Sequence, residues 1–299
     1  MKPDEFIPAN YSERFVRFFG WWSRDKMLAK RFFSVRLARG SAEALESLDD
    51  HAGPVIGAMN HLSWWDPIVM LNLHRWYFEG RTLRAPMNAD QLARFGFFRR
   101  LGTFGLNPDE PASLDAMARY LHDYFHAERH PTLWINPQGR FADPREPVEV
   151  RPGVARVAAS HDATRAVAVA LEYAFWTDQK PELLIRVMPI EPARTNTPGW
   201  LRAIRDTMAE NAARLAGLVI ARDPANFEAI LGGESTRVHP AYDLWMRLRG
   251  KAGAIDDGRD RAASADVLGS DDGPGSGDGI TSSEAAGGPS TRPAVSGTG

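Results

Sequence analysis

The residues of this sequence best suited to chemistry are His61 and Asp66, which follow a short apolar run at 54–59. A neutral imidazole can take a proton from an alcohol, and a carboxylate bound to its other nitrogen fixes the tautomer and stabilises the imidazolium that forms. The apolar run predicts a buried strand and a helical pattern begins at about Trp64, so the pair lies where α/β folds commonly place their functional groups. The alternative interpretation is a structural histidine, with Asp66 acting only as a charge at the start of the helix.

Strand and helix patterns alternate along the chain, which predicts one α/β domain with a central mixed sheet flanked by helices. We predict strands at 32–37, 54–59, 83–87, 132–135, 166–173 and 183–189, the last two being the final strands. We predict helices at 41–48 with Ser41 as its cap, at 64–78, from Pro111 with Asp109 as its cap, and at 152–160, 198–221, 224–231 and 241–248. The helix from Pro111 would turn these side chains inward: Leu114, Met117, Leu121 and Phe125.

Composition divides the chain into an N-terminal amphipathic helix at 1–31, the α/β domain at 32–250 and an acidic tail rich in Gly and Ser at 251–299. The tail has no aromatic residue and cannot bury enough apolar surface to offset its ordering entropy, so we predict that it is disordered. The absence of cysteine excludes disulfides, thiolate metal sites and cysteine nucleophiles, and it suits a reducing compartment. The first residues lack the pattern of a secretory signal, and we find no apolar run long enough to span a membrane.

The N-terminal helix pattern has an aromatic face. Phe15, Phe18, Phe19 and Trp22 recur at helical spacing, and residues 11–40 hold eight basic and two acidic residues. An aromatic face backed by arginines is typical of a helix that lies in a membrane interface, with its cations near anionic head groups. The alternative is an amphipathic helix that packs on its own domain, with the arginines facing solvent.

The residues around the pair resemble a known family. Asn60-His61 and Asp66, with Ser63 and Pro67, are similar to the Asn-His-x4-Asp motif and its continuation in the glycerolipid (lysophospholipid-type) acyltransferases. Three later blocks follow in the family's order: 97–107 with Gly102 in its turn, 134–141 with Asn136-Pro137-Gln138-Gly139-Arg140, and 166–171. The resemblance covers about residues 30–190.

The resemblance implies an O-acyltransferase that moves a fatty acyl group from acyl-CoA or acyl-carrier protein to a hydroxyl of a lipid acceptor. His61 would be the general base and Asp66 would orient it. Apart from the acyl donor, which is a co-substrate, the reaction would need no cofactor and no metal. The residues that would bind substrate are Asn60, Ser63, Gly102, Asn136, Pro137, Gln138, Gly139 and Arg140.

Two blocks depart from the family pattern. The strand of the second block ends Leu106-Asn107 without the family's arginine, and the third block has Gln138 for glutamate and Arg140-Phe141 for Thr-Arg. A phosphate dianion prefers bidentate arginine, so these changes weaken the case for a glycerol-phosphate acceptor. They favour a less charged acceptor such as a glycolipid, a glycosylated isoprenoid or another lipid alcohol, although Arg140, Arg145 or Arg151 could compensate.

Other functions remain open at this stage. A lipid-binding protein that has lost catalysis would explain the altered blocks, and a thioesterase would use water where the acceptor should lie. Nucleic-acid binding is disfavoured because the basic residues alternate with bulky apolar ones and the net charge is −2. The expected place of action is the cytoplasm, with peripheral contact to the inner face of the cell membrane.

Overall fold

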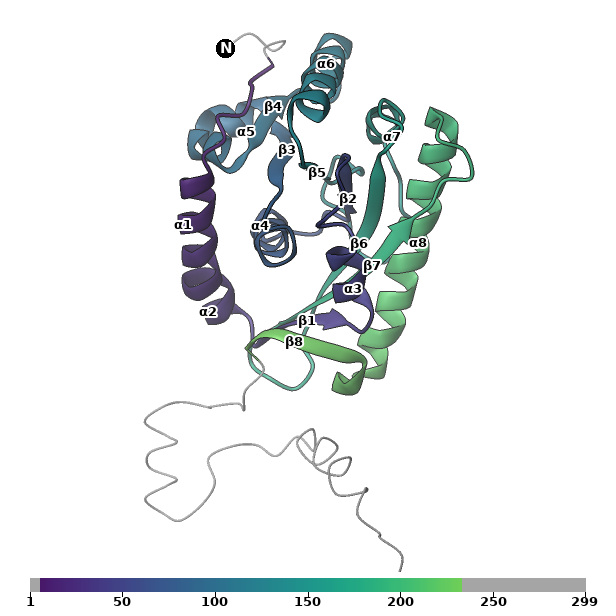
Figure 1. The fold of residues 1–299 in the computed structure, drawn as a ribbon. Coiled ribbons are helices and arrows are strands. Elements are labelled where there is room, and N and C mark those ends of the chain that lie inside the picture. Colours follow the sequence, from purple (N-terminus) through teal and green to yellow (C-terminus); the bar gives the residue numbers. More distant parts are fainter. Residues whose placement is uncertain (1–5, 233–299) are drawn as a thin grey trace, which may run out of the picture. The chain divides into compact units, whose positions relative to one another are not determined.

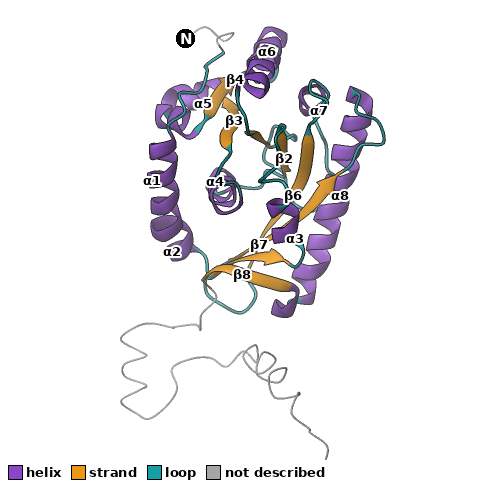
Figure 2. Ribbon diagram, viewed as in Figure 1, coloured by secondary structure: helices purple, strands orange, loops and turns teal. Residues whose placement is uncertain are grey.

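The computed structural model of the protein describes residues 6–232, so the predicted helix at 241–248 and the predicted tail at 251–299 lie outside the described residues. An eight-stranded sheet runs through the domain in the order β4-β3-β5-β2-β6-β7-β1-β8 (Figures 1 and 2). Its strands are β1 Ser34–Ala38, β2 Val55–Met59, β3 Thr82–Asn88, β4 Thr103–Leu106, β5 Pro131–Ile135, β6 Arg165–Ala174, β7 Glu182–Ile190 and β8 Phe227–Gly232. The predicted α/β fold with a mixed sheet is confirmed.

Parallel pairing dominates the centre of the sheet. The strands β4, β3, β5, β2 and β6 are parallel to one another. Strand β7 is antiparallel to β6 and parallel to β1, and β8 is antiparallel to β1. The carboxyl ends of β2, β5 and β6 therefore lie at one edge of the sheet, the edge where open α/β sheets bind their ligands.

Helices cover both faces of the sheet. They are α1 Glu13–Ser23, α2 Ala29–Arg31, α3 Ser41–Glu46, α4 Asp66–Tyr77, α5 Ala89–Arg94, α6 Pro111–Ala127, α7 Gly153–Ala158 and α8 Thr197–Ala221, with a π-helix at Arg24–Leu28 and 3-10 helices at Gly96–Leu101 and Pro224–Asn226. Successive side chains of a strand point to opposite faces, so Val55 and Met59 pack with α1, α3 and α4, whereas Ile56 and Ala58 pack with α6, α7 and α8.

Helix α4 occupies the centre of the first layer. Most of its length is buried, including Ile68, Leu71 and Leu73, because the sheet lies along one side of it and α1 along another (Figure 1). A helix that is apolar on nearly all sides is typical of such a buried position. The strand–loop–helix unit that carries His61 and Asp66 is thus held on both sides by the core.

Helix α1 packs on α4 through a stripe of small residues. Val16, Gly20 and Ser23 are buried, and the Ser23 hydroxyl accepts a hydrogen bond of 3.0 Å from Asn72 Nδ2. A Cβ on Gly20 would lie 2.3 Å from Cδ of Arg75, so glycine permits the close approach of the two helices. Of the predicted aromatic face, Phe15 and Phe19 also pack against the domain, whereas Phe18 and Trp22 are exposed.

Three predicted local features were wrong. Residues 224–231 form the 3-10 helix and strand β8 rather than a helix, because Phe227 and its neighbours pair with β1, so β6 and β7 are not the last strands. The residue at the cap position of α3 is Gly40 and not the predicted Ser41, whose hydroxyl accepts a hydrogen bond from the Val187 N–H. The residue at the cap position of α6 is Glu110 and not the predicted Asp109, which forms an ion pair with Arg151 at 3.0 Å.

The fold also buries an uncharged histidine that makes stability depend on pH. Nδ1 of His74 accepts a hydrogen bond from Trp134 Nε1 at 3.2 Å, and its Nε2 N–H donates to the Arg81 carbonyl at 3.1 Å. Burial disfavours the charged imidazolium and lowers the pKa of His74 from 6.5 to about 4. The unfolded chain therefore binds a proton between these two pH values that the folded chain does not bind.

We expect the free energy of unfolding to fall as the pH drops from 6.5 to 4, by about 3 kcal/mol from His74 alone. The contribution is fully present above pH 6.5 and is lost as the pH falls toward the folded pKa. Urea unfolding at several pH values checks this, with His74→Gln as the comparison. A glutamine side chain does not titrate, so the variant is less stable at neutral pH but has a shallower loss over this range. Parallel pH curves for the two proteins would contradict the prediction.

Candidate active site

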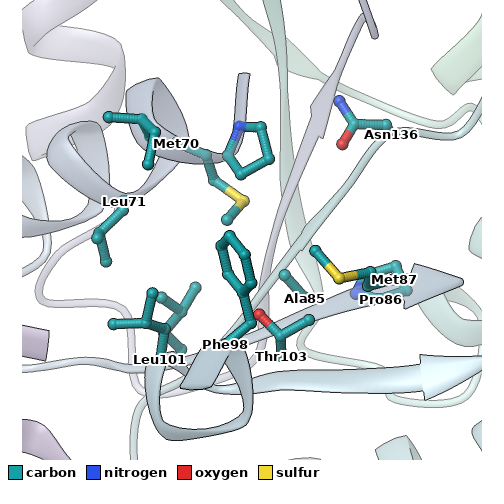
Figure 3. A pocket seen from close by; sticks show the side chains of 12 residues that line it. Met70, Leu71, Ala85, Pro86, Met87, Phe98, Leu101, Thr103 and Asn136 are labelled. Atoms are coloured by element: carbon teal, nitrogen blue, oxygen red, sulfur yellow. The ribbon is translucent and has the colours of Figure 1, made fainter. Parts of the chain in front are cut away.

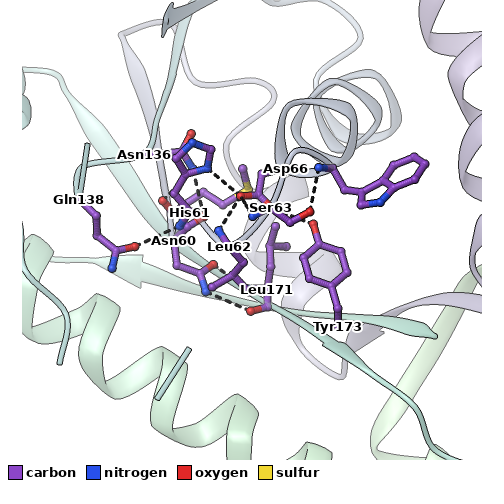
Figure 4. A network of polar contacts seen from close by, with 11 residues as sticks. Asn60, His61, Leu62, Ser63, Asp66, Asn136, Gln138, Leu171 and Tyr173 are labelled. Carbon is purple, nitrogen blue, oxygen red and sulfur yellow. Dashed lines mark hydrogen bonds and ion pairs between the residues drawn. The ribbon is translucent and has the colours of Figure 1, made fainter. Parts of the chain in front are cut away.

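His61 and Asp66 form a hydrogen-bonded pair at the carboxyl edge of the sheet. His61 lies in the loop that follows β2, and its Nδ1 is 2.7 Å from Oδ2 of Asp66 at the first turn of α4 (Figure 4). The Asp66 side chain is fully buried, whereas 21% of the His61 side chain is exposed. Nε2 of His61 has no hydrogen-bond partner among the described residues, so it is free to accept a proton from a bound molecule.

Four donors surround the Asp66 carboxylate. Besides His61, the backbone N–H groups of Leu62 and Ser63 donate to Oδ2 at 2.7 and 2.9 Å, which curls the loop around the carboxylate. The Tyr173 hydroxyl donates to Oδ1 at 2.7 Å from the carboxyl end of β6. Burial and the nearby Asp66 charge raise the pKa of Tyr173, so the phenol keeps its proton and remains a donor. Asp66 therefore has a fixed orientation and acts as more than a charge at a helix start.

Two asparagines hold the loop to the ends of three strands. The Asn60 side chain donates to the Leu171 carbonyl at 3.0 Å and accepts from the Leu171 N–H at 2.8 Å, which joins β2 to β6. Asn136 donates from Nδ2 to the carbonyls of Met59 and Asn60 at 3.1 and 3.0 Å, which joins β2 to β5. The Gln138 side chain accepts from the His61 N–H at 3.0 Å. The first and third sequence blocks therefore meet at His61 (Figure 4).

The turn after β5 directs the chain back over His61. Gly139 has a φ of +68°, and its N–H donates to the Asn136 carbonyl at 3.0 Å. That N–H is used within the turn, so it is not free for a substrate oxygen. Beyond the turn, the Ala142 N–H donates to the His61 carbonyl at 2.8 Å, and the Phe141 ring lies 4.2 Å from the imidazole ring.

The structure does not bring every predicted binding residue to His61. Ser63 caps its own turn, with Oγ accepting from the Trp65 N–H at 3.0 Å, while Pro137 accepts at its carbonyl from the Arg151 N–H. Arg140 is exposed and pairs with Glu146 at 2.7 Å. Gly102 lies before β4, three strands from β2, with a φ of +94°. Its N–H donates to the Arg99 carbonyl and its carbonyl accepts from the Ala85 N–H, so its binding role stays a prediction.

An apolar pocket begins beside this pair and extends under α4. It lies between α4, β3 and the 3-10 helix at Gly96–Leu101, with a volume of about 30 Å³ (Figure 3). Asn136 and Pro67 are among its lining residues, and Met70, Met87 and Phe98 contribute flexible or large apolar side chains. The sequence blocks did not indicate this pocket. They contribute part of its lining, but the rest comes from α4 and β3, and only the fold brings these segments together.

Part of the predicted aromatic face of α1 packs against the domain, and part of it is exposed to solvent. Phe15 and Phe19 are partly buried, with Phe15 under the Arg100 guanidinium at 4.4 Å and Phe19 against Phe97 at 5.6 Å. Phe18 and Trp22 are exposed, and they are joined on the surface by Trp21 and Phe97. No helix within the described residues 6–232 is long and apolar enough to cross a membrane. We call Phe18, Trp21, Trp22 and Phe97 the aromatic patch.

One known family matches the part of the chain that carries this site. Residues 33–171 match the model of the family described as Acyltransferase, a stretch that contains β1 to β6 and the residues around His61. This match agrees with the family resemblance that the motifs predicted, and it supports acyl transfer as the general class of chemistry.

Other comparisons add little. No curated protein matches the chain. The X-ray structure of the Legionella pneumophila ATPase DotB is similar over 75% of this chain and 63% of that chain, with 8% identity and a TM-score of 0.28. A likeness at this level carries no argument about fold or function.

Proposed function

We propose that the protein transfers a fatty acyl group from an acyl thioester, acyl-CoA or acyl-carrier protein, to a hydroxyl of a lipid acceptor. The observation that carries the proposal is the His61–Asp66 pair, with Nδ1 of His61 bound and Nε2 free, within an acyltransferase-family domain. A base whose far nitrogen is held by a buried carboxylate is the arrangement that activates an alcohol.

The reaction needs no acyl-enzyme. Nε2 of His61 takes the proton from the acceptor hydroxyl as the oxygen attacks the thioester carbonyl carbon. The imidazolium that forms is stabilised by Asp66. The carbon–sulfur bond then breaks, and His61 returns the proton to the leaving sulfur, which gives an ester and a free thiol.

The test is thiol release from a long-chain acyl thioester, measured with and without lipid alcohols. Release that depends on the acceptor and yields its ester would support acyl transfer. Release without any acceptor would support a thioesterase. Binding of lipid without release from either type of donor would support a lipid-binding protein that has lost catalysis.

The apolar pocket beside α4 is the proposed entry for the acyl chain. It begins at Asn136 and Pro67, which adjoin the loop of His61 and Asp66, and it is lined by apolar side chains (Figure 3). Its volume of about 30 Å³ is too small for a long chain, so Met70 and Met87 would have to change rotamer. Methionine is suited to such adjustment because its side chain is unbranched and flexible.

Filling this pocket should change the preference for donor chain length. Ala85 lines it from β3, and Ala85→Met would place three additional heavy atoms where the chain is expected to pass. We expect a loss of about 2 kcal/mol in the transfer of long chains, or roughly 30-fold in kcat/KM, with little change for short chains. Rates with a series of acyl thioesters check this, with Ala203→Met on α8 as the control. An equal effect at every chain length would contradict the prediction.

The aromatic patch is the proposed contact with a membrane, on the cytoplasmic face, where a lipid acceptor would be reached. Phe18, Trp21 and Trp22 are 56%, 47% and 38% exposed on α1, although they are large and apolar. Arg100 lies next to the patch on Phe15. Aromatic rings with nearby arginines favour the interface of a membrane that contains anionic lipid.

We expect the triple variant Phe18→Ser, Trp21→Ser, Trp22→Ser to bind anionic vesicles at least roughly tenfold more weakly than the wild type, because its apolar contact area is lost. Co-sedimentation with vesicles of anionic and zwitterionic lipid checks this. Ile220→Ser on α8 is the matched control, since Ile220 is 80% exposed but lies outside the patch. Equal loss of binding in both variants would contradict a role for the patch.

A further inference from the structure

The ring of Phe141 lies directly beside the proposed base. Its centroid is 4.2 Å from that of the His61 imidazole, with 36° between the ring planes. The hydrogen bond from the Ala142 N–H to the His61 carbonyl fixes the chain next to it. Even so, 58% of Phe141 is exposed, so an apolar ring forms part of the accessible surface next to His61.

The charges that surround this ring do not form a phosphate site. The segment 139–151 supplies three arginines, and each is paired with a carboxylate: Arg140 with Glu146 at 2.7 Å, Arg145 with Asp143 at 2.6 Å and Arg151 with Asp109 at 3.0 Å. Exposed ion pairs are weak and could open. An entering phosphate would then compete with the released carboxylate for the same arginine.

Further carboxylates make the surroundings net acidic. Glu149 belongs to the same segment, and Glu172 lies near enough to Arg145 and Asp143 for their charges to affect it. These two acids and the three paired ones outnumber the three arginines. A dianionic group near His61 would meet electrostatic repulsion rather than a cationic cradle.

We propose, on the basis of the acyl transfer proposed above, that the acceptor presents an uncharged polyol headgroup, a sugar or glycerol, and that Phe141 is the residue that selects it. The face of an aromatic ring is electron-rich, so it attracts the C–H face of a polyol and repels an anion. With its C–H face on Phe141, the headgroup can direct a hydroxyl at Nε2 of His61. The arginine pairs then remain closed.

The experiment compares acceptors with one acyl donor: monoacylglycerol and glucosyl-diacylglycerol as uncharged polyols, and lysophosphatidate as the phosphate-bearing lipid. We expect the wild type to favour the uncharged acceptors at least tenfold in kcat/KM. Phe141→Leu keeps an apolar side chain but loses the aromatic face, and we expect it to raise KM for the uncharged acceptors at least fivefold while KM for the donor stays constant. Phe141→Arg should shift the preference toward lysophosphatidate.

Three results would overturn the inference. Preference of the wild type for lysophosphatidate would overturn it while leaving acyl transfer in place. A change of the donor KM alone in Phe141→Leu would assign the ring to the acyl chain instead. Transfer to no acceptor at all would overturn the proposed function itself, so the two failures are distinguishable. Unfolding curves of both variants show whether they remain folded during the assay.

Discussion

Replacing His61 by alanine is expected to lower acceptor-dependent thiol release by roughly 10³-fold, because the proposed general base is then lost. General-base catalysis typically contributes roughly 10²- to 10⁴-fold, and the expected effect lies in the middle of this range because a buried carboxylate supports His61. The measurement is kcat at saturating donor and acceptor. KM for either substrate should change little, because the base acts mainly in the transition state.

The control for His61→Ala is His126→Ala. This variant removes an exposed imidazole from α6, a helix that does not carry the loop of His61 and Asp66. Both variants should give similar thermal unfolding curves, since Asp66 keeps its bonds from Leu62, Ser63 and Tyr173 when His61 is truncated. Retention of more than a tenth of the wild-type kcat in a folded His61→Ala protein would show that another group is the base.

The sequence predicted the pair and its position well because both depend on local chemistry. A buried apolar strand, a short loop and a helix start lie within residues 55–66, and hydrogen bonds across four and five positions close the loop around Asp66. The third block could also be recognised in the sequence, because glycine is the residue that best suits a sharp turn with a positive φ. The structure gives Gly139 such a φ. The pattern did not show that Gln138 accepts from the His61 N–H.

The partners that complete the site come from strands whose pairing a single sequence does not reveal. Tyr173 is 107 positions from Asp66, and it reaches the carboxylate only because β6 lies parallel to and beside β2. Strand β8 was missed for a similar reason: Phe227, Ile230 and Leu231 fit the spacing of either a helix or a strand, and pairing with β1 decides between them. Asp109 likewise resembles a helix cap, but Arg151 is its partner.

The role of Asp66 is best tested by Asp66→Asn, which removes the charge while preserving an acceptor. The amide oxygen can take the place of Oδ2 and receive the bonds from His61, Leu62 and Ser63, and the amide N–H₂ can donate to the Tyr173 oxygen. The loop and the His61 tautomer should therefore be kept. The imidazolium loses its charged partner, which is worth about 2–3 kcal/mol, so we expect kcat to fall roughly 100-fold.

The comparison with Asp66→Ala separates structure from charge. Alanine leaves the partly buried N–H groups of Leu62 and Ser63 without their acceptor. Each fully buried group of this kind would cost about 1–3 kcal/mol, so this variant should also unfold at lower urea concentration. Asp66→Asn should instead keep most of the stability while losing the rate. If Asp66→Asn retained kcat within about threefold of the wild type, the carboxylate would serve to shape the loop, and the charge that stabilises His61 would have to come from elsewhere.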